Sequence, residues 1–159
     1  MNAIYPGTFD PITLGHIDII ARAISVFGQI TVAIAHHNNK DSIFSAKKRT
    51  EMANMALKEF GLNANAVMFE GLLVDFMQQN NAKIIIRGLR ASSDFEYEFQ
   101  MSCMNSRLNS TIETVFLPAK DDMHFISSKM IKSVASIGGD VSQFVPKCIS
   151  PILTNYYKK

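Results

Sequence analysis

The residues with the most evident chemistry lie in the first sixteen positions, which read MNAIYPGTFDPITLGH. A short apolar run ending at Tyr5 predicts a strand, and a helical pattern begins around Gly15 and His16. The loop between them would place backbone N–H groups at a helix N-terminus, where the helix dipole also attracts anions. Thr8 and His16 add side-chain donors at the same place. This stretch therefore predicts a phosphate-binding loop.

Further hydrogen-bond donors lie where later apolar runs end or helical patterns begin. They are Lys40, Arg87, Arg90, Ser127 and Ser128. A site of donors without a general base is suited to transfer of a nucleotidyl group to an acceptor that is already ionised. A phosphate monoester meets this condition, because its second pKa of about 6 leaves it ionised at neutral pH. The donors therefore favour nucleotidyl transfer to a phosphate.

Several common catalytic motifs are absent from the sequence. It contains no G-x-x-x-x-G-K-[ST], no G-x-G-x-x-G and no G-x-S-x-G. Their absence disfavours P-loop hydrolysis, dinucleotide oxidoreduction and serine-nucleophile chemistry. Cys103 and Cys148 have no plausible base near them in the sequence, so they do not support covalent catalysis. We expect both to be buried thiols with no chemical role, kept reduced in the cytoplasm.

Apolar runs of strand length alternate with helical periodicities along the chain. Strands are expected at the N-terminus and at residues 30–35, 65–69, 83–87 and 113–117. Helices are expected at residues 15–27, 46–60 after a Ser45 cap, 72–80 and 93–108, then beyond residues 125–129 and near the C-terminus. This alternation predicts an α/β fold, with a doubly wound, Rossmann-like, five-stranded parallel sheet and helices on both faces. We expect one domain over residues 1–159.

In such sheets, ligands bind beyond the carboxyl ends of the strands. Four polar clusters of this sequence are expected at that edge. They lie at residues 8–16, 36–40, 87–90 and 125–129. Their convergence predicts an active site there without reference to any family.

The composition limits the classes of function. The chain has 159 residues, of which 47% are hydrophobic, and a formal net charge of only +2. So small a charge disfavours nucleic-acid binding and favours a small anionic ligand. No stretch reaches the roughly 18 apolar residues of a membrane span, and no signal peptide is visible, so we expect a cytoplasmic protein. The nine methionines are expected to fill the core.

The run YPGTFDPITLGH resembles the signature of the bacterial phosphopantetheine adenylyltransferase family. Its last four residues, Thr13 to His16, match the T/H-x-G-H motif of the wider nucleotidyltransferase superfamily. The similarity spans nearly the whole chain and continues at Lys40 and at residues 86–90, 94–98 and 125–128. The departures from the family pattern are Leu14, His124 and Lys129.

The resemblance implies an enzyme of coenzyme A biosynthesis. The family joins ATP to 4′-phosphopantetheine: the pantetheine phosphate attacks the α-phosphorus, which gives dephospho-coenzyme A and pyrophosphate. Mg²⁺ would accompany ATP, held by phosphate oxygens, with no dedicated protein metal site. The family is usually hexameric, which implies a homo-oligomer. No nucleic-acid or membrane partner is implied.

The resemblance also implies which residues form the site. His16 would stabilise the transition state and bind ATP, and Thr8 would lie between the two substrates. Lys40 and Arg87 would clamp the phosphopantetheine phosphate, while Leu73 would line the pantetheine channel. The other ATP contacts would be Phe9, Gly88, Leu89, Arg90, Glu98, Met123, His124, Phe125, Ile126, Ser127, Ser128 and Lys129. Catalysis would rest on Thr8, His16, Lys40, Arg90 and Ser128.

Other interpretations stay open. The motif also fits another small nucleotidyltransferase, acting on glycerol phosphate or nicotinamide mononucleotide, and the fold fits a non-catalytic adenine-nucleotide sensor. Arg87 and Arg90 could pair with Asp94 or Glu98 instead of binding phosphate. Glu98 could lie on the exposed face of its helix, and His124 could lie in solvent or at the rim of the nucleotide site.

Overall fold

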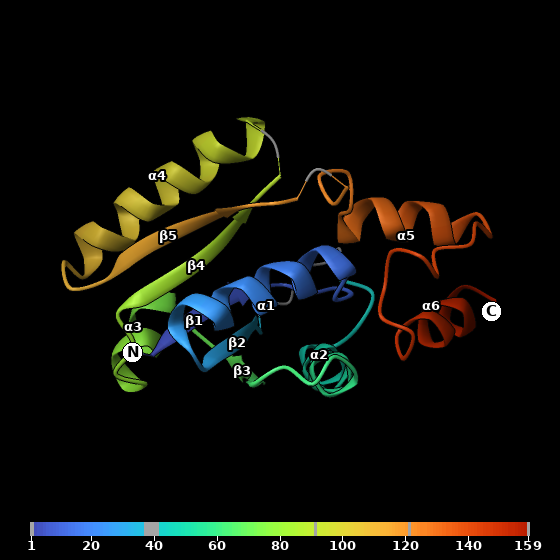
Figure 1. Ribbon diagram of the computed structural model, residues 1–159, viewed down its shortest axis with the longest axis horizontal. Helices are drawn as coiled ribbons and strands as arrows, with labels where there is room; N and C mark the ends of the chain where they lie inside the picture. The colour runs from blue at the N-terminus through green and yellow to red at the C-terminus, as the bar shows by residue number, and fades with distance from the viewer. Residues whose placement is uncertain (1, 37–41, 91, 121, 159) are drawn as a thin grey trace.

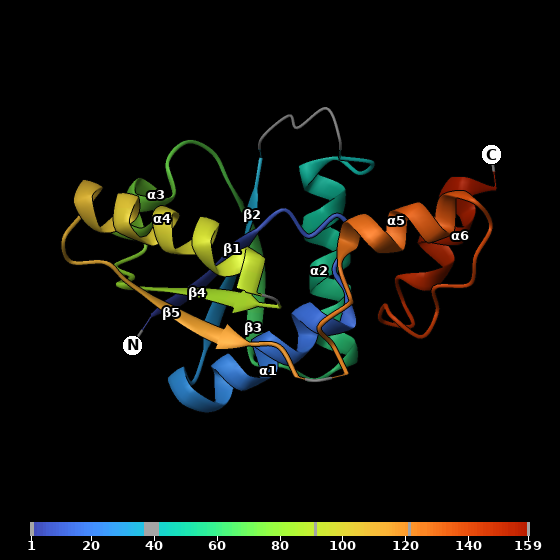
Figure 2. The same cartoon turned by 90° about the horizontal axis from the view of Figure 1, so that it is seen from above.

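The computed structural model describes residues 2–36, 42–90, 92–120 and 122–158, without the side chains of residues 92 and 93. The strands are β1 (Ala3–Gly7), β2 (Ile30–Ala35), β3 (Ala64–Phe69), β4 (Ile84–Leu89) and β5 (Glu113–Pro118). The helices are α1 (Leu14–Phe27), α2 (Ala46–Glu59), α3 (Leu73–Gln79), α4 (Ser92–Leu108), α5 (Ser128–Ser136) and α6 (Ser150–Tyr157). Figures 1 and 2 show that α5 and α6 lie together at one end of the molecule.

The five strands are all parallel and lie in the order β3-β2-β1-β4-β5. β1 is central, because residues 3–7 pair with residues 30–34 of β2 while Ala3 and Ile4 pair with Ile84 and Ile85 of β4. The chain moves outward from β1 to β3 and then crosses back to β4. This confirms the predicted doubly wound α/β fold. The carboxyl ends of β1 and β4 flank the point where the direction of the chain reverses.

Helices cover both faces of the sheet. Alternate side chains of a strand point to opposite faces, and two buried clusters reflect this. Ile4 of β1 lies in the cluster that contains Val74 and Met77 of α3. Tyr5 of β1 lies in the larger cluster, which includes the buried side chains of α1 and α2. Since α4 packs on α3, β4 and β5, α1 and α2 cover one face and α3 and α4 cover the other.

Short polar side chains begin three of the helices. Thr13, Ser45 and Ser127 each accept, through the side-chain oxygen, the backbone N–H of the residue three positions later. These contacts satisfy N–H groups that have no partner within the helix. The predicted cap at Ser45 is confirmed. α1 ends at Gly28, whose φ of 81° lies in the region that favours glycine.

α4 leaves much of its apolar surface exposed. Met101 and Met104 are 40% and 57% exposed, whereas Met52 and Met77 are fully buried. The prediction that the methionines fill the core is therefore wrong for these two, and also for Met55, Met68 and Met130, which are 43%, 43% and 53% exposed. α4 packs on the β4–β5 side of the sheet and turns part of its apolar surface outward. α4 is also the longest helix, with 17 residues. None of the helices in the described part of the chain combines the length and apolarity needed to cross a membrane.

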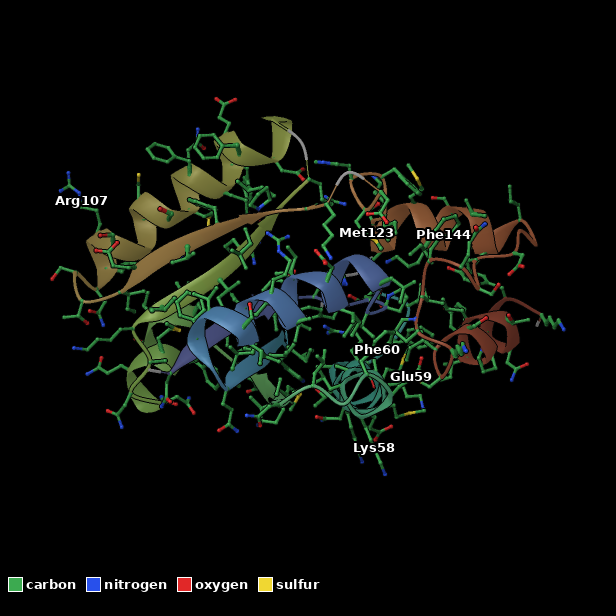
Figure 3. All side chains as sticks on the ribbon, in the orientation of Figure 1. Lys58, Glu59, Phe60, Arg107, Met123 and Phe144 are labelled. Carbon is green, nitrogen blue, oxygen red and sulfur yellow. The ribbon has the colours of Figure 1, made fainter. Side chains whose placement is uncertain are left out.

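Glu59, at the end of α2, connects this helix to the segment that leads into α6 (Figure 3). Its carboxylate accepts the backbone N–H groups of Lys147 and Cys148 at 3.0 and 2.8 Å. Burial, together with Glu59, raises the pKa of the Cys148 thiol to about 12, so this thiol is unreactive at neutral pH. Cys103 lies exposed on α4 and Cys148 is half-buried, so the prediction that both thiols are buried is wrong for Cys103 and met only in part by Cys148.

The packing of α1 predicts how two substitutions on this helix differ. Ile20 is fully buried, whereas Val26 is 66% exposed. We expect Ile20→Ala to lower the free energy of unfolding by about 2–5 kcal/mol, because it leaves a cavity in the core. The control Val26→Ala should change it by less than about 0.5 kcal/mol. Urea unfolding followed by circular dichroism measures both, and equal losses would contradict the orientation of α1.

Candidate active site

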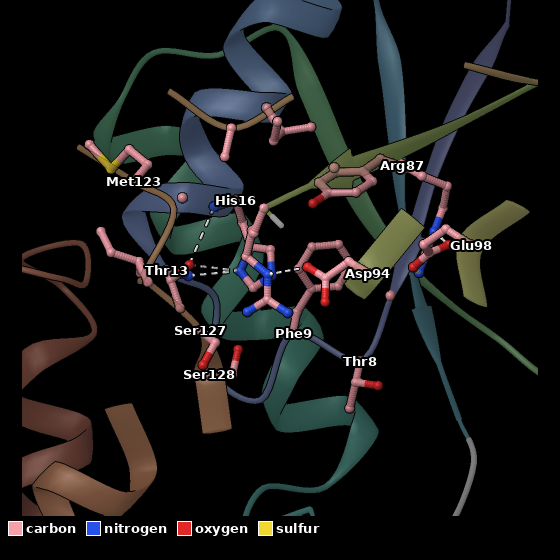
Figure 4. Close-up of a pocket in the computed structure, with 18 of the residues that line it drawn as sticks. Thr8, Phe9, Thr13, His16, Arg87, Asp94, Glu98, Met123, Ser127 and Ser128 are labelled. Carbon is pink, nitrogen blue, oxygen red and sulfur yellow. Dashed lines mark hydrogen bonds and ion pairs between the residues drawn. The ribbon is translucent and has the colours of Figure 1, made fainter. Parts of the chain in front are cut away.

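A cavity of about 510 Å³ opens at the carboxyl ends of β1 and β4 (Figure 4). The loop after β1, the first turn of α1, α4 and the segment entering α5 surround it. Its lining residues are Tyr5, Pro6, Gly7, Thr8, Phe9, Thr13, Gly15, His16, Ile19, Arg87, Gly88, Arg90, Asp94, Tyr97, Glu98, Ala119, Met123, Ile126, Ser127, Ser128 and Lys129. Segments from distant parts of the chain thus meet at the topological switch point of the sheet.

Thr13 fixes the ring of His16 at the start of α1 (Figure 4). The backbone N–H of Thr13 donates to His16 Nδ1 at 3.0 Å, and Thr13 Oγ1 accepts the backbone N–H of His16 at 3.3 Å. This is a capping box in which an imidazole replaces the usual Glu or Gln side chain. Because an amide N–H can only donate, Nδ1 accepts and the ring proton of the neutral imidazole lies on Nε2. The ring therefore offers an Nε2–H donor in the cavity.

His16 is neutral at physiological pH. Burial, followed by the charges of Arg90 and Arg87, lowers the pKa of His16 from 6.5 to about 3. A neutral donor held in place can stabilise charge that develops on a phosphate oxygen. Between these two pKa values the unfolded chain binds a proton that the folded chain does not, so this site lowers stability as the pH falls from 6.5 toward 3.

Phe9 forms the wall behind His16. Its ring packs edge-on against Tyr5 and His16, with centroid distances of 5.2 and 4.9 Å. Phe9 is buried and has a φ of 49°, which is uncommon for a non-glycine residue. A Cβ atom at Gly7 would lie only 2.8 Å from the Phe9 ring. Gly7 is therefore required for the close approach of this ring, which supports the imidazole.

The two arginines of the cavity are bound by carboxylates. Nε and Nη2 of Arg87 contact both carboxylate oxygens of Glu98, and Nη1 donates to the carbonyl of Pro6 at 2.7 Å. Nε of Arg90 contacts Asp94 at 3.1 Å. Both pairings that the sequence left open are thus present. The Glu98 side chain is only 13% exposed, so the interpretation that it lies on an exposed face is wrong. The contacts of Arg87 use three of its five N–H donors.

A second, more apolar cavity of about 300 Å³ adjoins the first. The two share the lining residues Pro6, Gly7, Thr8, Arg87, Tyr97 and Glu98. The other lining residues of the second cavity are Ala35, Phe69, Leu73, Ile85, Met101, Ser102, Asn105 and Thr114. The predicted channel residue Leu73 therefore lies in the second cavity, apart from His16. The cavities adjoin along these shared residues, which include the Arg87–Glu98 pair.

The structure brings together most of the residues predicted from the sequence. Those that line the first cavity are Thr8, Phe9, His16, Arg87, Gly88, Arg90, Glu98, Met123, Ile126, Ser127, Ser128 and Lys129. Leu89, His124 and Phe125 lie outside the lining of both cavities, and their contacts with ATP stay predictions. His124 is exposed, and its Nδ1 contacts the carbonyl of Arg90. Lys40 lies outside the described residues.

Nine lining residues were not among the predicted site residues: Tyr5, Pro6, Gly7, Thr13, Gly15, Ile19, Asp94, Tyr97 and Ala119. Thr13 could have been found from its spacing, because a threonine three positions before a hydrogen-bonding side chain is typical of a capping box. Asp94 lies four positions after Arg90, a spacing that allows pairing at the start of a helix. Tyr5 and Tyr97 lie within the stretches that resemble the family, but the sequence gave neither of them a role.

The cavity is suited to an anion. The described residues contain no group of three or more His, Cys, Asp or Glu side chains that could hold a metal ion. The two carboxylates of the cavity, Asp94 and Glu98, are engaged by Arg90 and Arg87. Hydroxyl, guanidinium, imidazole and ammonium donors, with the N-termini of α1 and α5, make up the rest of its polar lining. Such a set of donors is typical of a phosphate site.

Comparison with known proteins decides the family. Residues 4–134 match the family model of cytidylyltransferase-like proteins. A phosphopantetheine adenylyltransferase of Wolbachia pipientis subsp. Culex pipiens (strain wPip) is 51% identical over 152 residues, which are 96% of this chain and 90% of that one. This chain belongs to the phosphopantetheine adenylyltransferase family. Another member, from Heliobacterium modesticaldum (strain ATCC 51547 / Ice1), is 47% identical over 98% of this chain and 92% of its own length.

A solved structure of low sequence identity shares the fold of this chain. Nicotinic acid mononucleotide adenylyltransferase of Plasmodium falciparum, complexed with NaAD, has a TM-score of 0.68 and covers 98% of this chain and 93% of its own. Its sequence identity is 16%, so this likeness concerns the fold alone. The family assignment rests on sequence, and the shared fold is consistent with it.

The contacts of His16 predict its state in solution. We expect a neutral imidazole protonated on Nε2 at pH 6, because the Thr13 N–H occupies Nδ1 and burial lowers the pKa to about 3. Long-range ¹H–¹⁵N correlation spectra of the histidine rings measure both properties, and His16→Gln identifies the signal. An imidazolium pattern at pH 6, or a proton on Nδ1, would contradict the assignment.

Proposed function

We propose that this chain transfers the adenylyl group of ATP to 4′-phosphopantetheine, forming dephospho-coenzyme A and pyrophosphate. The observation that carries the proposal is the junction of two unlike cavities at Thr8 and Arg87. A polar cavity next to an apolar one suits a nucleotide triphosphate and an acceptor with a phosphate at one end and a long flexible arm. The identity of 51% with a phosphopantetheine adenylyltransferase supports this choice of substrates.

In this proposal, ATP occupies the first cavity, with its triphosphate between the loop after β1 and the start of α5. Arg90, Ser127 and Ser128, with the N-terminus of α5, hold the β- and γ-phosphates. The pantetheine arm lies along Leu73 in the second cavity. Its phosphate reaches Thr8 and Arg87, where the cavities join. Lys40 is proposed to complete the clamp on this phosphate.

The reaction is an in-line displacement. An oxygen of the acceptor phosphate forms a bond to the α-phosphorus of ATP, the bond from this phosphorus to the bridging oxygen breaks, and pyrophosphate leaves. The acceptor is already ionised, so no general base is needed. The Nε2–H of His16 donates to an oxygen of the α-phosphate as negative charge develops there. Catalysis then rests on positioning and on charge stabilisation by donors already in place.

Glu98 acts in this proposal by holding the Arg87 guanidinium at the junction. A bidentate carboxylate fixes the plane of the guanidinium, and the Pro6 carbonyl fixes a third donor. The remaining N–H groups of Arg87 are then held in a fixed direction by its pairing with Glu98. An acceptor phosphate therefore meets an arginine that has already lost its conformational freedom.

Mg²⁺ is proposed to arrive with ATP. Its positive charge would neutralise negative charge on the phosphate oxygens. The donor chemistry of the cavity fits a metal held by the nucleotide, because Asp94 and Glu98 are both engaged by arginines. This assignment requires no protein ligand for the metal.

The chain is also proposed to work in the cytoplasm as a homo-oligomer, a hexamer by its resemblance. The exposed apolar side of α4 supports self-association, because monomeric proteins rarely leave large contiguous apolar patches in water. Phe95, Phe99 and Met104 on this helix are 46%, 51% and 57% exposed. Burial between copies would remove this surface from solvent.

The proposed reaction is tested by pyrophosphate release from ATP with three acceptors: phosphopantetheine, glycerol phosphate and nicotinamide mononucleotide. We expect release only with phosphopantetheine. His16→Ala should still bind ATP but lose about 10²- to 10³-fold in kcat, the scale of one lost transition-state donor. Val26→Ala, at a residue outside the lining of both cavities, serves as the control. Release with another acceptor, or ATP binding without any turnover, would overturn the proposal.

Self-association is tested on α4. We expect light scattering to give a mass near that of a hexamer for the wild type and a smaller species for Met104→Glu, because a buried charge in an apolar interface is costly. The control Val26→Glu places the same charge on an exposed position of α1. A monomeric wild type, or equal effects of the two variants, would contradict an interface on α4.

A further inference from the structure

Two charged residues lie buried beneath the loop that follows β1. Asp10 and Arg49 are each 2% exposed. Charged side chains are almost never this buried unless they are paired or fully hydrogen-bonded. Neither residue lines the first or the second cavity. Their burial therefore points to a role in holding the loop and not in touching a substrate.

Asp10 joins three segments. Its Oδ2 accepts the backbone N–H of Ile43 at 2.9 Å, and its Oδ1 accepts that of Phe44 at 3.0 Å. Oδ2 also forms an ion pair with Lys132 Nζ of α5 at 2.8 Å. One carboxylate thus connects the loop after β1 to the chain that enters α2 and to the body of α5.

Arg49, in the first turn of α2, holds the same loop from the other side. Its guanidinium donates to the carbonyl of Thr8 and, at 3.1 Å each, to the carbonyls of Ala35 and Phe44. Burial lowers the pKa of Arg49, while the charge of Asp10 opposes this. Since Thr8 lines both cavities, this contact fixes the backbone of a residue at their junction.

Lys132 follows Ser128 by one helical turn, so the two side chains share a face of α5. Ser128 Oγ donates to the carbonyl of Pro11 at 2.8 Å, directly next to Asp10. The start of α5 is therefore joined to the loop at two successive points, Ser128 to Pro11 and Lys132 to Asp10. Ser127 and Ser128 line the cavity at this start (Figure 4).

We propose that the Asp10–Lys132 pair, braced by Arg49, is a positioning device that sets the distance between the start of α5 and the His16 loop. The inference rests on the proposed function, because α5 is taken to hold the β- and γ-phosphates of ATP. Asp10, Arg49 and Lys132 act through other residues and touch no substrate. Small displacements at such a site are costly, since a shift of about 1 Å can reduce a rate about 10²-fold.

The proposal predicts a selective loss of affinity for the outer phosphates. In Lys132→Met, α5 loses its ion pair with Asp10, so ATP should bind more weakly while AMP, which has no β- or γ-phosphate, should bind as before. We expect the ratio of ATP to AMP affinity to fall about tenfold, the scale of one charge-assisted contact. Isothermal titration of each nucleotide without acceptor measures this ratio and requires no turnover.

Three further variants separate positioning from simple stability. Lys132→Arg keeps the charge and should retain the ratio within about twofold. Asp10→Asn keeps the shape and an acceptor oxygen, and should lower the ratio about threefold, which serves as the test if Lys132→Met does not fold. Lys48→Met removes a lysine from a surface pair with Glu51 on α2 and should change nothing.

The outcomes are distinct. The positioning role is supported if the ratio of ATP to AMP affinity falls in Lys132→Met but stays at the wild-type value in Lys132→Arg and Lys48→Met. A wild-type ratio in both Lys132→Met and Asp10→Asn overturns it, even if these variants are less stable. A wild type that binds ATP no better than AMP overturns it as well, because α5 would then hold no outer phosphates. Failure of the proposed function shows separately, as a wild type that binds ATP with the expected ratio but releases no pyrophosphate with phosphopantetheine.

Discussion

The structure depends on the central place of β1 in the sheet. With β2 on one side and β4 on the other, β1 is covered on both faces, and its carboxyl end leads into the loop that lines the first cavity. The connections from β1 and from β4 leave toward opposite faces, which opens a crevice at this end that side chains can line but helices do not fill. The loop of residues 8–13, Arg87 and Arg90 at the end of β4, and the start of α5 all reach the crevice for this reason.

In the crevice and directly beneath it, three polar groups are fixed by backbone. The ring of His16 is held by an amide N–H of Thr13, the guanidinium of Arg49 by three carbonyls, and the Asp10 carboxylate by two amide N–H groups. Backbone partners change little when side chains vary, and they do not titrate. A site built in this way is already organised before ligands arrive, so binding costs less ordering.

The sequence predicted the sheet well because its strands carry unbroken apolar runs such as residues 30–35, which suit strands covered on both faces. It could not predict that α4 is exposed, since periodicity shows which residues share a helix face but not what that face contacts. It also could not decide how Arg87 and Glu98 are used, because pairing and ligand binding call for the same residue types. The buried role of Asp10 was hidden, since its partners come from segments about 30 and about 120 positions away.

One consequence follows from the capping box at the start of α1. His16 contributes the ring nitrogen that caps the backbone of Thr13 and the donor that faces the α-phosphate in the proposed reaction. Folding therefore uses Nδ1 of the ring, and the proposed reaction uses Nε2. A substitution of His16 would lose both the cap on Thr13 and the donor for the α-phosphate. A lysine or arginine has no acceptor atom, so it could replace only the donor. A replacement side chain would have to present an acceptor and a donor on opposite edges, as the imidazole ring does.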